Sequence, residues 1–214
     1  MKKTVFIAVA FLLAGCVTST PAVMAPPTDA PAVADTPIKS PSGEYALDPA
    51  HSSVVWRVQH MGLALYTARF SKIEGTLTLD AQAPTNSKVS ISIDTNSVDT
   101  ALAGATAKKN FDAAIAKGIG AEKTPTITFV STKLERTGAQ TGRMTGDLTM
   151  NGVTKPATFD IILRGEGTNT LNQKPAMGIQ AHGTIKRSDW GATFMSIFAA
   201  DVVDIDIDAE LDKK

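Results

Sequence analysis

The side chains that most often build catalytic or metal centres are few in this chain. They are three histidines, His51, His60 and His182, and one cysteine, Cys16. A catalytic site needs a nucleophile, a base or a metal brought to one place. The histidines lack the close spacing of the common zinc signatures, and the sequence contains no Gly-x-Ser-x-Gly elbow, phosphate-binding glycine loop or dinucleotide fingerprint. The sequence therefore predicts no catalytic residue, no metal and no cofactor, although distant histidines can still converge in a fold.

The cysteine indicates attachment to a membrane. Lys2 and Lys3 precede an apolar run over residues 5–14, an arrangement typical of a secretory signal and too short to span a bilayer. Residues 13–16, Leu-Ala-Gly-Cys, resemble the bacterial lipobox, in which a diacylglyceryl group is joined to the thiol before cleavage. We expect residues 1–15 to be a signal peptide and Cys16 to be the lipid anchor. The alternative is an incidental cysteine near an ordinary cleavage site.

The residue after the cysteine bears on location. It is Val17, whereas Asp at this place tends to retain lipoproteins at the inner membrane. By that resemblance, we expect a periplasm-facing protein anchored to the outer membrane.

Composition and charge exclude other classes. The 214 residues include 21 Lys plus Arg and 21 Asp plus Glu, so no positive field favours nucleic acid. Hydrophobic residues make up 43 % and charged residues 20 %, which is an ordinary globular balance. A single cysteine cannot form an internal disulfide. The fold must therefore depend on its apolar core.

The chain is expected to have three parts. Residues 16–42 are rich in Pro, Ala, Thr and Ser and contain almost no large apolar side chains, so they cannot bury enough surface to offset the entropy of ordering. We expect them to form a disordered, semi-stiff tether between the signal peptide of residues 1–15 and a folded domain over residues 43–214.

The folded part has the period-two pattern of antiparallel strands. Apolar and polar residues alternate in eight runs, namely 53–60, 75–79, 88–93, 126–129, 147–150, 157–161, 183–185 and 203–208. Asn151-Gly152 predicts a hairpin, and an Ala- and Lys-rich stretch predicts a short helix over residues 107–117, ended by Gly118. We expect an all-β, eight-stranded antiparallel barrel with a helical insertion, or a sandwich. Closure into a barrel is the simplest way to remove sheet edges.

The remaining charged motifs have simple structural explanations. Arg187 and Asp189, in the segment Arg-Ser-Asp-Trp-Gly, predict a corner locked by an ion pair, with a cation at a tunnel mouth as the alternative. Asp204, Asp206 and Asp208 alternate with apolar residues, which favours a solvated strand face over a calcium site.

Several separated segments resemble one bacterial family. They are residues 45–53 (Tyr-Ala-Leu-Asp-Pro-Ala-His-Ser-Ser), 58–62, 126–129, 146–156 (Gly-Asp-Leu-Thr-Met-Asn-Gly-Val-Thr-Lys-Pro) and 187–191. In this order they resemble the YceI-like family of exported proteins. The resemblance implies an elongated, lipocalin-like barrel that binds polyisoprenoids, including isoprenoid quinones, in a hydrophobic tunnel. The chain departs from the family's pattern over residues 99–124, where an insertion could change the length or access of the ligand.

The resemblance also bears on the inward-facing residues, which the alternation alone would place in a solid core. If the barrel holds a ligand, the predicted wall consists of Trp56, Val58, His60, Phe70, Ile127, Phe129, Leu148, Met150, Phe159 and Ile161. His60 is expected to point inward near a strand end, either to contact a polar head group or to be satisfied by neighbouring protein groups.

Three functions remain open at this stage. The first is a non-enzymatic carrier or storage protein for an isoprenoid lipid. The second is a solid barrel that acts as an interaction module for a membrane redox or stress-response partner, and the third is an enzyme acting on a bound lipid. The sequence leaves homodimerisation open.

Overall fold

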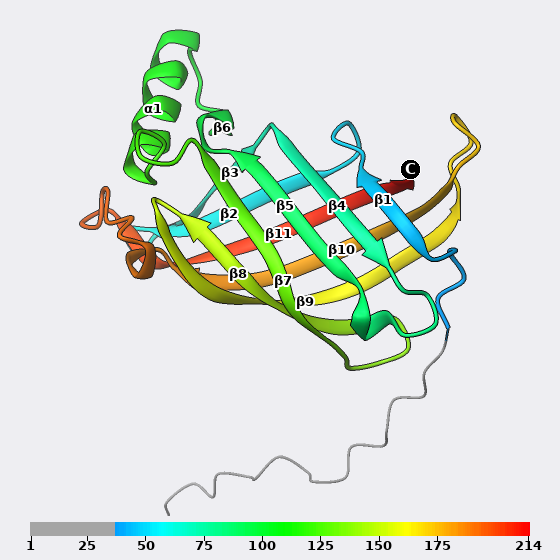
Figure 1. Ribbon diagram of the computed structural model, residues 1–214. Helices are drawn as coiled ribbons and strands as arrows, with labels where there is room; N and C mark the ends of the chain where they lie inside the picture. The colour runs from blue at the N-terminus through cyan, green and yellow to red at the C-terminus, as the bar shows by residue number, and fades with distance from the viewer. Residues whose placement is uncertain (1–36) are drawn as a thin grey trace, which may run out of the picture. The chain divides into compact units, whose positions relative to one another are not determined.

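The alternating runs form strands that wind around a common axis (Figure 1). The computed structural model describes residues 37–214. Its strands are β1 (Gly43–Leu47), β2 (Ser53–His60), β3 (Ala64–Phe70), β4 (Ile73–Leu79), β5 (Lys88–Asp94), β6 (Val98–Asp99), β7 (Thr126–Arg136), β8 (Thr141–Met150), β9 (Val153–Thr168), β10 (Pro175–Lys186) and β11 (Ala199–Lys213). Three short 3-10 helices lie between strands, namely η1 (Pro84–Asn86), η2 (Thr95–Ser97) and η3 (Arg187–Trp190).

Eight of the strands close a barrel. The order β1-β4-β5-β7-β8-β9-β10-β11 returns to β1 because β11 also pairs with it, with Tyr45 opposite Lys213. Every pairing is antiparallel, and the interruptions of register are bulges, as at Ser131–Lys133 between β7 and β8. The predicted all-β, eight-stranded antiparallel barrel is confirmed.

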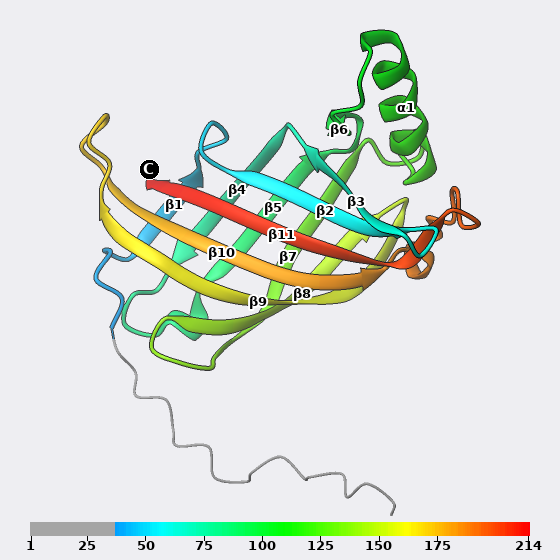
Figure 2. The same ribbon diagram turned by 180° about the vertical axis from the view of Figure 1, so that it is seen from behind.

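The strands β2, β3 and β6 extend the sheet beyond the closed barrel. One edge of β11 pairs with β1 near the C-terminus and with β2 over residues 199–208, so β1 and β2 follow the same edge in succession. The break between them lies at Asp48–Ser52. Figure 2 shows β2 and β3 continuing past the barrel toward the end where the helix stands.

The predicted helix is present and slightly longer than expected. It is α1 (Ala105–Gly118), and Lys108 on it contacts Asp99 at 2.9 Å. The carboxylate of Asp112 accepts hydrogen bonds from Lys108 and from Thr100. Burial raises the pKa of Asp112, but these hydrogen bonds outweigh burial and hold the pKa below its usual value. Polar contacts therefore secure α1 to Asp99 of β6 and to Thr100, which follows it.

The predicted hairpin at Asn151-Gly152 is also confirmed. β8 ends at Met150 and β9 begins at Val153, and the two linking residues have φ of 52° and 75°. Two consecutive positive φ values are typical of a type I′ turn, which matches the twist of the flanking strands.

The corner at Arg187–Trp190 differs in its chemistry from the prediction. Arg187 does not lock it through Asp189. Its guanidinium donates to the backbone carbonyls of Ala192, Phe194, Ala199 and Ala200, and Asp189 instead contacts Lys155 at 3.4 Å. A planar guanidinium has five N–H donors that point in different directions. Several carbonyls placed around it can accept from more of these donors than a single carboxylate can. The structural role of Arg187 is confirmed, and the ion pair within the motif is wrong.

Candidate ligand cavity

The barrel interior holds an apolar cavity at the end where β1 begins and β11 finishes. Its cavity volume is about 160 Å³. Inward-facing side chains of all eight barrel strands form most of its wall, namely Leu47, Leu77, Leu79, Val89, Ile91, Leu134, Met144, Ile161, Leu163, Met177, Ile179, Ala181, Ile207, Ala209 and Leu211. An apolar wall with few polar groups suits an aliphatic ligand.

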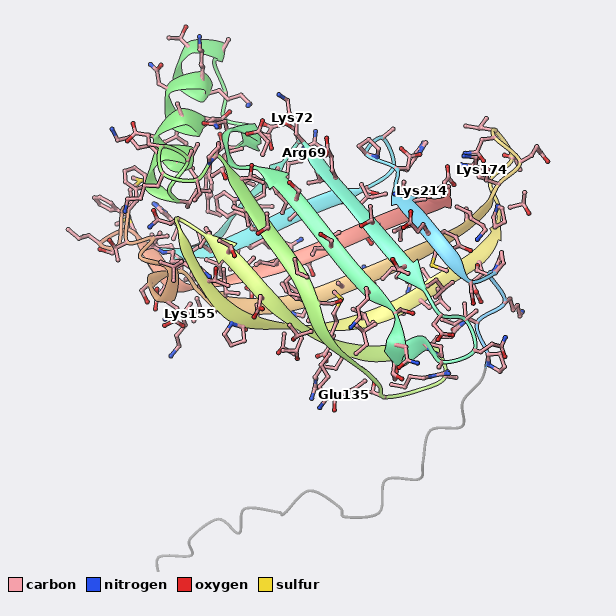
Figure 3. All side chains as sticks on the ribbon, in the orientation of Figure 1. Arg69, Lys72, Glu135, Lys155, Lys174 and Lys214 are labelled. Atoms are coloured by element: carbon pink, nitrogen blue, oxygen red, sulfur yellow. The ribbon has the colours of Figure 1, made fainter. Side chains whose placement is uncertain are left out.

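Polar groups border the cavity in two places. The loop before β5 contributes Thr85 and Ser87, and the hairpin of β7 and β8 contributes Glu135, Arg136, Gln140 and Thr141. Figure 3 shows Glu135, which lies near the end of β7, at the rim of the barrel. An amphipathic molecule would therefore place its apolar chain inside and its polar end at this rim.

The segment that precedes β1 forms one side of the mouth. Ile38 lines the cavity, and its N–H donates to the carbonyl of Ala81 at 3.3 Å. The N–H of Ser40 donates to Glu166 at 2.7 Å, and the hydroxyl of Tyr45 donates to the carbonyl of Pro41 at 2.7 Å. Tyr45 is fully buried, and this burial raises the pKa of its hydroxyl. These bonds fix Ile38 in the wall.

The predicted wall residues are brought together, but mostly outside this cavity. Only Ile161 lines it. Phe70, Ile127, Phe129, Leu148, Met150 and Phe159 belong to one buried cluster, and Trp56 packs against that cluster. Val58 is buried as well. This cluster fills the barrel interior beyond the inner end of the cavity. Contact of its residues with a ligand stays a prediction.

His60 differs from its predicted position. It continues the alternation of Val54 and Val58, but β2 extends past the barrel there and the histidine is exposed. The alternation correctly predicted the side of β2 on which His60 lies. It could not show that the opposite wall of the barrel ends before this position.

Two buried polar atoms near α1 lack partners among residues 37–214. They are Nε1 of Trp56 and the hydroxyl of Tyr66, and the two rings lie 6.3 Å apart. Tyr66 also meets the ring of Phe111 on α1 edge to face. A buried donor without a partner is destabilising unless water or a ligand atom satisfies it.

The other two histidines lie in polar clusters on the outer surface. His182 contacts Asp206 at 2.8 Å, and Arg57 pairs with the same carboxylate. Hydrogen bonds from His182 and Arg57 lower the pKa of Asp206 although burial opposes them. The acidic row of β11 is thus a polar outer strand face, as predicted.

His51 lies in the loop between β1 and β2. Its Nδ1 is 2.7 Å from Asp48, which lowers the pKa of the aspartate and raises that of the histidine, and a carboxylate oxygen of Glu210 lies within 4.8 Å. Asp48 also accepts a hydrogen bond from the N–H of Ala50, as in an Asx turn. The cluster therefore has a local structural role in closing the loop.

Exposed apolar side chains gather at the end opposite the cavity mouth. Leu63 in the turn between β2 and β3 is 81 % exposed, and Ile197 in the loop before β11 is 88 % exposed. The two segments are joined by a hydrogen bond from the N–H of Met61 to the carbonyl of Phe198. Within residues 37–214, no helix is both long and apolar enough to cross a bilayer.

Comparison with known proteins identifies the family. The YceI-like domain matches residues 45–211. Proteins named YceI from Salmonella arizonae and Salmonella enteritidis are 36 % identical over 154 residues, which cover 71 % of this chain and 78 % of each relative.

Solved structures agree with this result. The YceI protein of Campylobacter jejuni has a TM-score of 0.60 at 26 % identity, covering 72 % of this chain and 89 % of that one. BcnA of Burkholderia cenocepacia has a TM-score of 0.65 at 22 % identity, covering 77 % and 98 %. A polyisoprenoid binding domain from Saccharophagus degradans has a TM-score of 0.59 at 14 % identity, covering 79 % and 98 %. At such low identity the last two show the fold alone. The chain belongs to the YceI-like family.

Proposed function

We propose that this protein binds a polyisoprenoid lipid or isoprenoid quinone in its barrel, without catalysis, as a periplasmic carrier or storage protein. The observation that carries the proposal is the cavity, whose wall is apolar along the barrel strands and whose polar lining residues come from the loop before β5 and from the hairpin of β7 and β8. The polyisoprenoid binding domain with the same fold supports this ligand class. The bound lipid is cargo, and no cofactor is proposed.

The geometry supports binding better than turnover. The histidines His51 and His182 lie in salt-bridged clusters on the outer surface, away from the apolar wall. Hydrolysis or group transfer on a lipid would need a nucleophile or base beside the reacting bond. The residues that line the inner part of the cavity are hydrocarbon or thioether side chains, which offer neither.

We further propose that the protein faces the periplasm and is anchored to the outer membrane through a lipid on Cys16. This residue lies outside the described part of the chain, so the proposal depends on the lipobox and on Val17. Several acyl chains on one residue give stable membrane attachment, where one chain does not. A carrier attached in this way would remain close to its lipid source.

The test is organic extraction of the purified full-length protein, followed by mass spectrometry. Ala209→Trp should fill the cavity, since Ala209 lies on its wall, and should reduce the lipid recovered per folded molecule several-fold. Gln180→Trp is the matched control, because Gln180 bonds Asp208 on the outer face and should leave the lipid content unchanged.

The proposal fails if wild-type extracts are repeatedly free of isoprenoids. Such a result would favour an interaction module. It also fails if Ala209→Trp retains the wild-type lipid content while folded, because the lipid would then be bound elsewhere.

A further inference from the structure

The cavity ends at one level on three neighbouring strands. On each of these strands, the inward-facing residues nearest the mouth line the cavity, and the next inward-facing residue along the strand does not. On β8, Gly142 and Met144 line the cavity and Gly146 does not. On β9, Leu163 and Ile161 line it and Phe159 does not. On β10, Met177, Ile179 and Ala181 line it and Gly183 does not.

Two phenylalanines occupy this level. The rings of Phe129 and Phe159 meet edge to face, with centroids 5.4 Å apart and planes at 89°. Both side chains are buried. Phe129 is paired with Ile91 and Phe159 with Met144, and both partners line the cavity. The pair therefore stands directly at the inner end of the cavity.

Two glycines allow the rings to occupy this position. A Cβ at Gly146 would come within 2.8 Å of Cε2 of Phe129, and one at Gly183 would come within 2.7 Å of Cδ1 of Phe159. The same Cβ atoms would lie 2.5 Å from the carbonyl oxygen of Val130 and 2.7 Å from that of Thr158. The absence of a side chain therefore leaves room both for each ring and for the backbone of the neighbouring strand. A glycine inside a strand costs stability, and the close approach of each ring offsets that cost.

We propose that Phe129 and Phe159 form a partition that sets the length of the apolar chain the barrel admits. The inference rests on the proposed function and specifies the ligand further. A chain that enters at the mouth ends against the two rings, so short isoprenoids are fully covered. Longer isoprenoids leave part of their apolar chain outside the mouth in water, which lowers their affinity.

The partition separates the cavity from an interior that continues beyond it. Leu148 and Met150 lie further along β8 in the same buried cluster as the two rings. Removal of one ring would therefore extend the cavity inward along the barrel without opening its wall. Conversely, a larger side chain at Ala181, the last lining position on β10, would shorten the cavity.

The experiment compares chain lengths directly. Full-length protein, stripped of lipid, is loaded from detergent with an equimolar mixture of farnesol, geranylgeraniol and solanesol, and the retained alcohols are quantified by mass spectrometry. Wild type should favour the short chains. Phe129→Ala and Phe159→Ala should each raise the ratio of solanesol to farnesol by about tenfold or more, which corresponds to about 1.4 kcal/mol. Ala181→Leu should lower it.

Phe111→Ala is the matched control. Phe111 is a partly buried aromatic residue of α1 that packs against the same cluster, meets the ring of Tyr66 edge to face and does not line the cavity. Its truncation removes the same ring and should leave the ratio at the wild-type value. A change in Phe111→Ala equal to that in Phe159→Ala would indicate general loosening of the core and would overturn the partition.

The possible failures are distinguishable. If wild type retains none of the alcohols, the proposed function itself is refuted. If wild type binds them and both Phe→Ala variants fold with an unchanged ratio, only the partition is refuted. If those variants do not fold, Ala181→Leu provides the test. A partition at this level requires the shortened cavity of this variant to lower the ratio of solanesol to farnesol, and an unchanged ratio would refute the partition.

Discussion

The two tyrosines of the chain provide a matched test of the structure, because the same substitution should have opposite effects at the two sites. Tyr45 is fully buried and donates a hydrogen bond of 2.7 Å to the carbonyl of Pro41, which holds the segment beside the cavity mouth. The hydroxyl of Tyr66 is buried without a hydrogen-bond partner among residues 37–214. Tyr→Phe keeps the ring in both cases and removes only the hydroxyl.

The magnitudes follow from the hydrogen bonds. Tyr45→Phe loses one neutral hydrogen bond, which contributes about 0.5–1.5 kcal/mol. Pro41 is exposed, so water can satisfy its carbonyl and the cost falls toward the lower limit. For a domain of this size, about 1 kcal/mol lowers the melting temperature by about 2–4 °C. Tyr66→Phe removes an unsatisfied buried group and should be neutral or stabilising by up to about 1 kcal/mol.

The assay is urea unfolding of the lipid-free protein, followed by tryptophan fluorescence and by circular dichroism. Tyr45→Phe should be the less stable variant. A loss of stability in Tyr66→Phe as large as that in Tyr45→Phe, or larger, would refute this expectation, because the hydroxyl of Tyr66 would then make a hydrogen bond in the folded protein.

Alkaline pH gives a second readout on the same residue. Burial raises the pKa of Tyr45 in the folded state, so above about pH 10 the unfolded chain loses this proton while the folded protein retains it. The folded state then binds more protons than the unfolded state, and stability falls as pH rises. Tyr45→Phe should make this alkaline loss smaller. An unchanged pH profile would show that the hydroxyl ionises as readily in the folded protein as in the unfolded chain.

Three further predictions concern the anchor, the helix and the corner. Cys16→Ser should leave the barrel folded and release the protein from membranes, and its persistence in the membrane pellet after a carbonate wash would exclude the lipid anchor. Asp112→Asn should weaken the attachment of α1 by about 1–3 kcal/mol, measured as faster proteolysis between β6 and β7. Because the pKa of Asp112 is lowered in the folded state, this contribution is present above about pH 4 and is lost as pH falls through the folded pKa, so wild type and variant should converge in acid. Trp190→Phe should cost about 0.5–1.5 kcal/mol in unfolding experiments, since Nε1 of Trp190 donates to the carbonyl of Leu148 in the core; an unchanged free energy of unfolding would contradict that bond.

Much of the fold could be predicted because it depends on local pattern. Period-two alternation identified seven of the eight barrel strands together with β2, and it missed β1, β3 and β6. Asn151-Gly152 identified a tight hairpin, and the Ala- and Lys-rich stretch identified α1 within two residues at its start. The pairing of β11 with both β1 and β2 was not predictable in this way. It depends on how far each strand extends past its neighbour, and alternation carries no information on that distance.

The position of the cavity could not be predicted from the sequence, for a related reason. Ile161 and Phe159 are both inward-facing apolar residues of β9, two positions apart, yet one lines the cavity and the other closes it. Their side chains differ in size, but what fills the barrel at each level depends on the residues that meet there from other strands. Only the register of β5, β7, β8 and β9 places Ile91 opposite Phe129 and Met144 opposite Phe159.

A signal for the inner end of the cavity was nevertheless present in the glycines. Gly146 and Gly183 occupy inward positions within strands, where a missing side chain would ordinarily leave a gap in the core. A glycine at such a position indicates that another group approaches the backbone closely, and a phenylalanine on a neighbouring strand is large enough to do so. Phe129 can be assigned to Gly146, and Phe159 to Gly183, only once the register of the strands is known. The two glycines and two phenylalanines therefore form one packing unit. Gly183→Ala should lower the free energy of unfolding, because the added Cβ would lie 2.7 Å both from Cδ1 of Phe159 and from the carbonyl oxygen of Thr158.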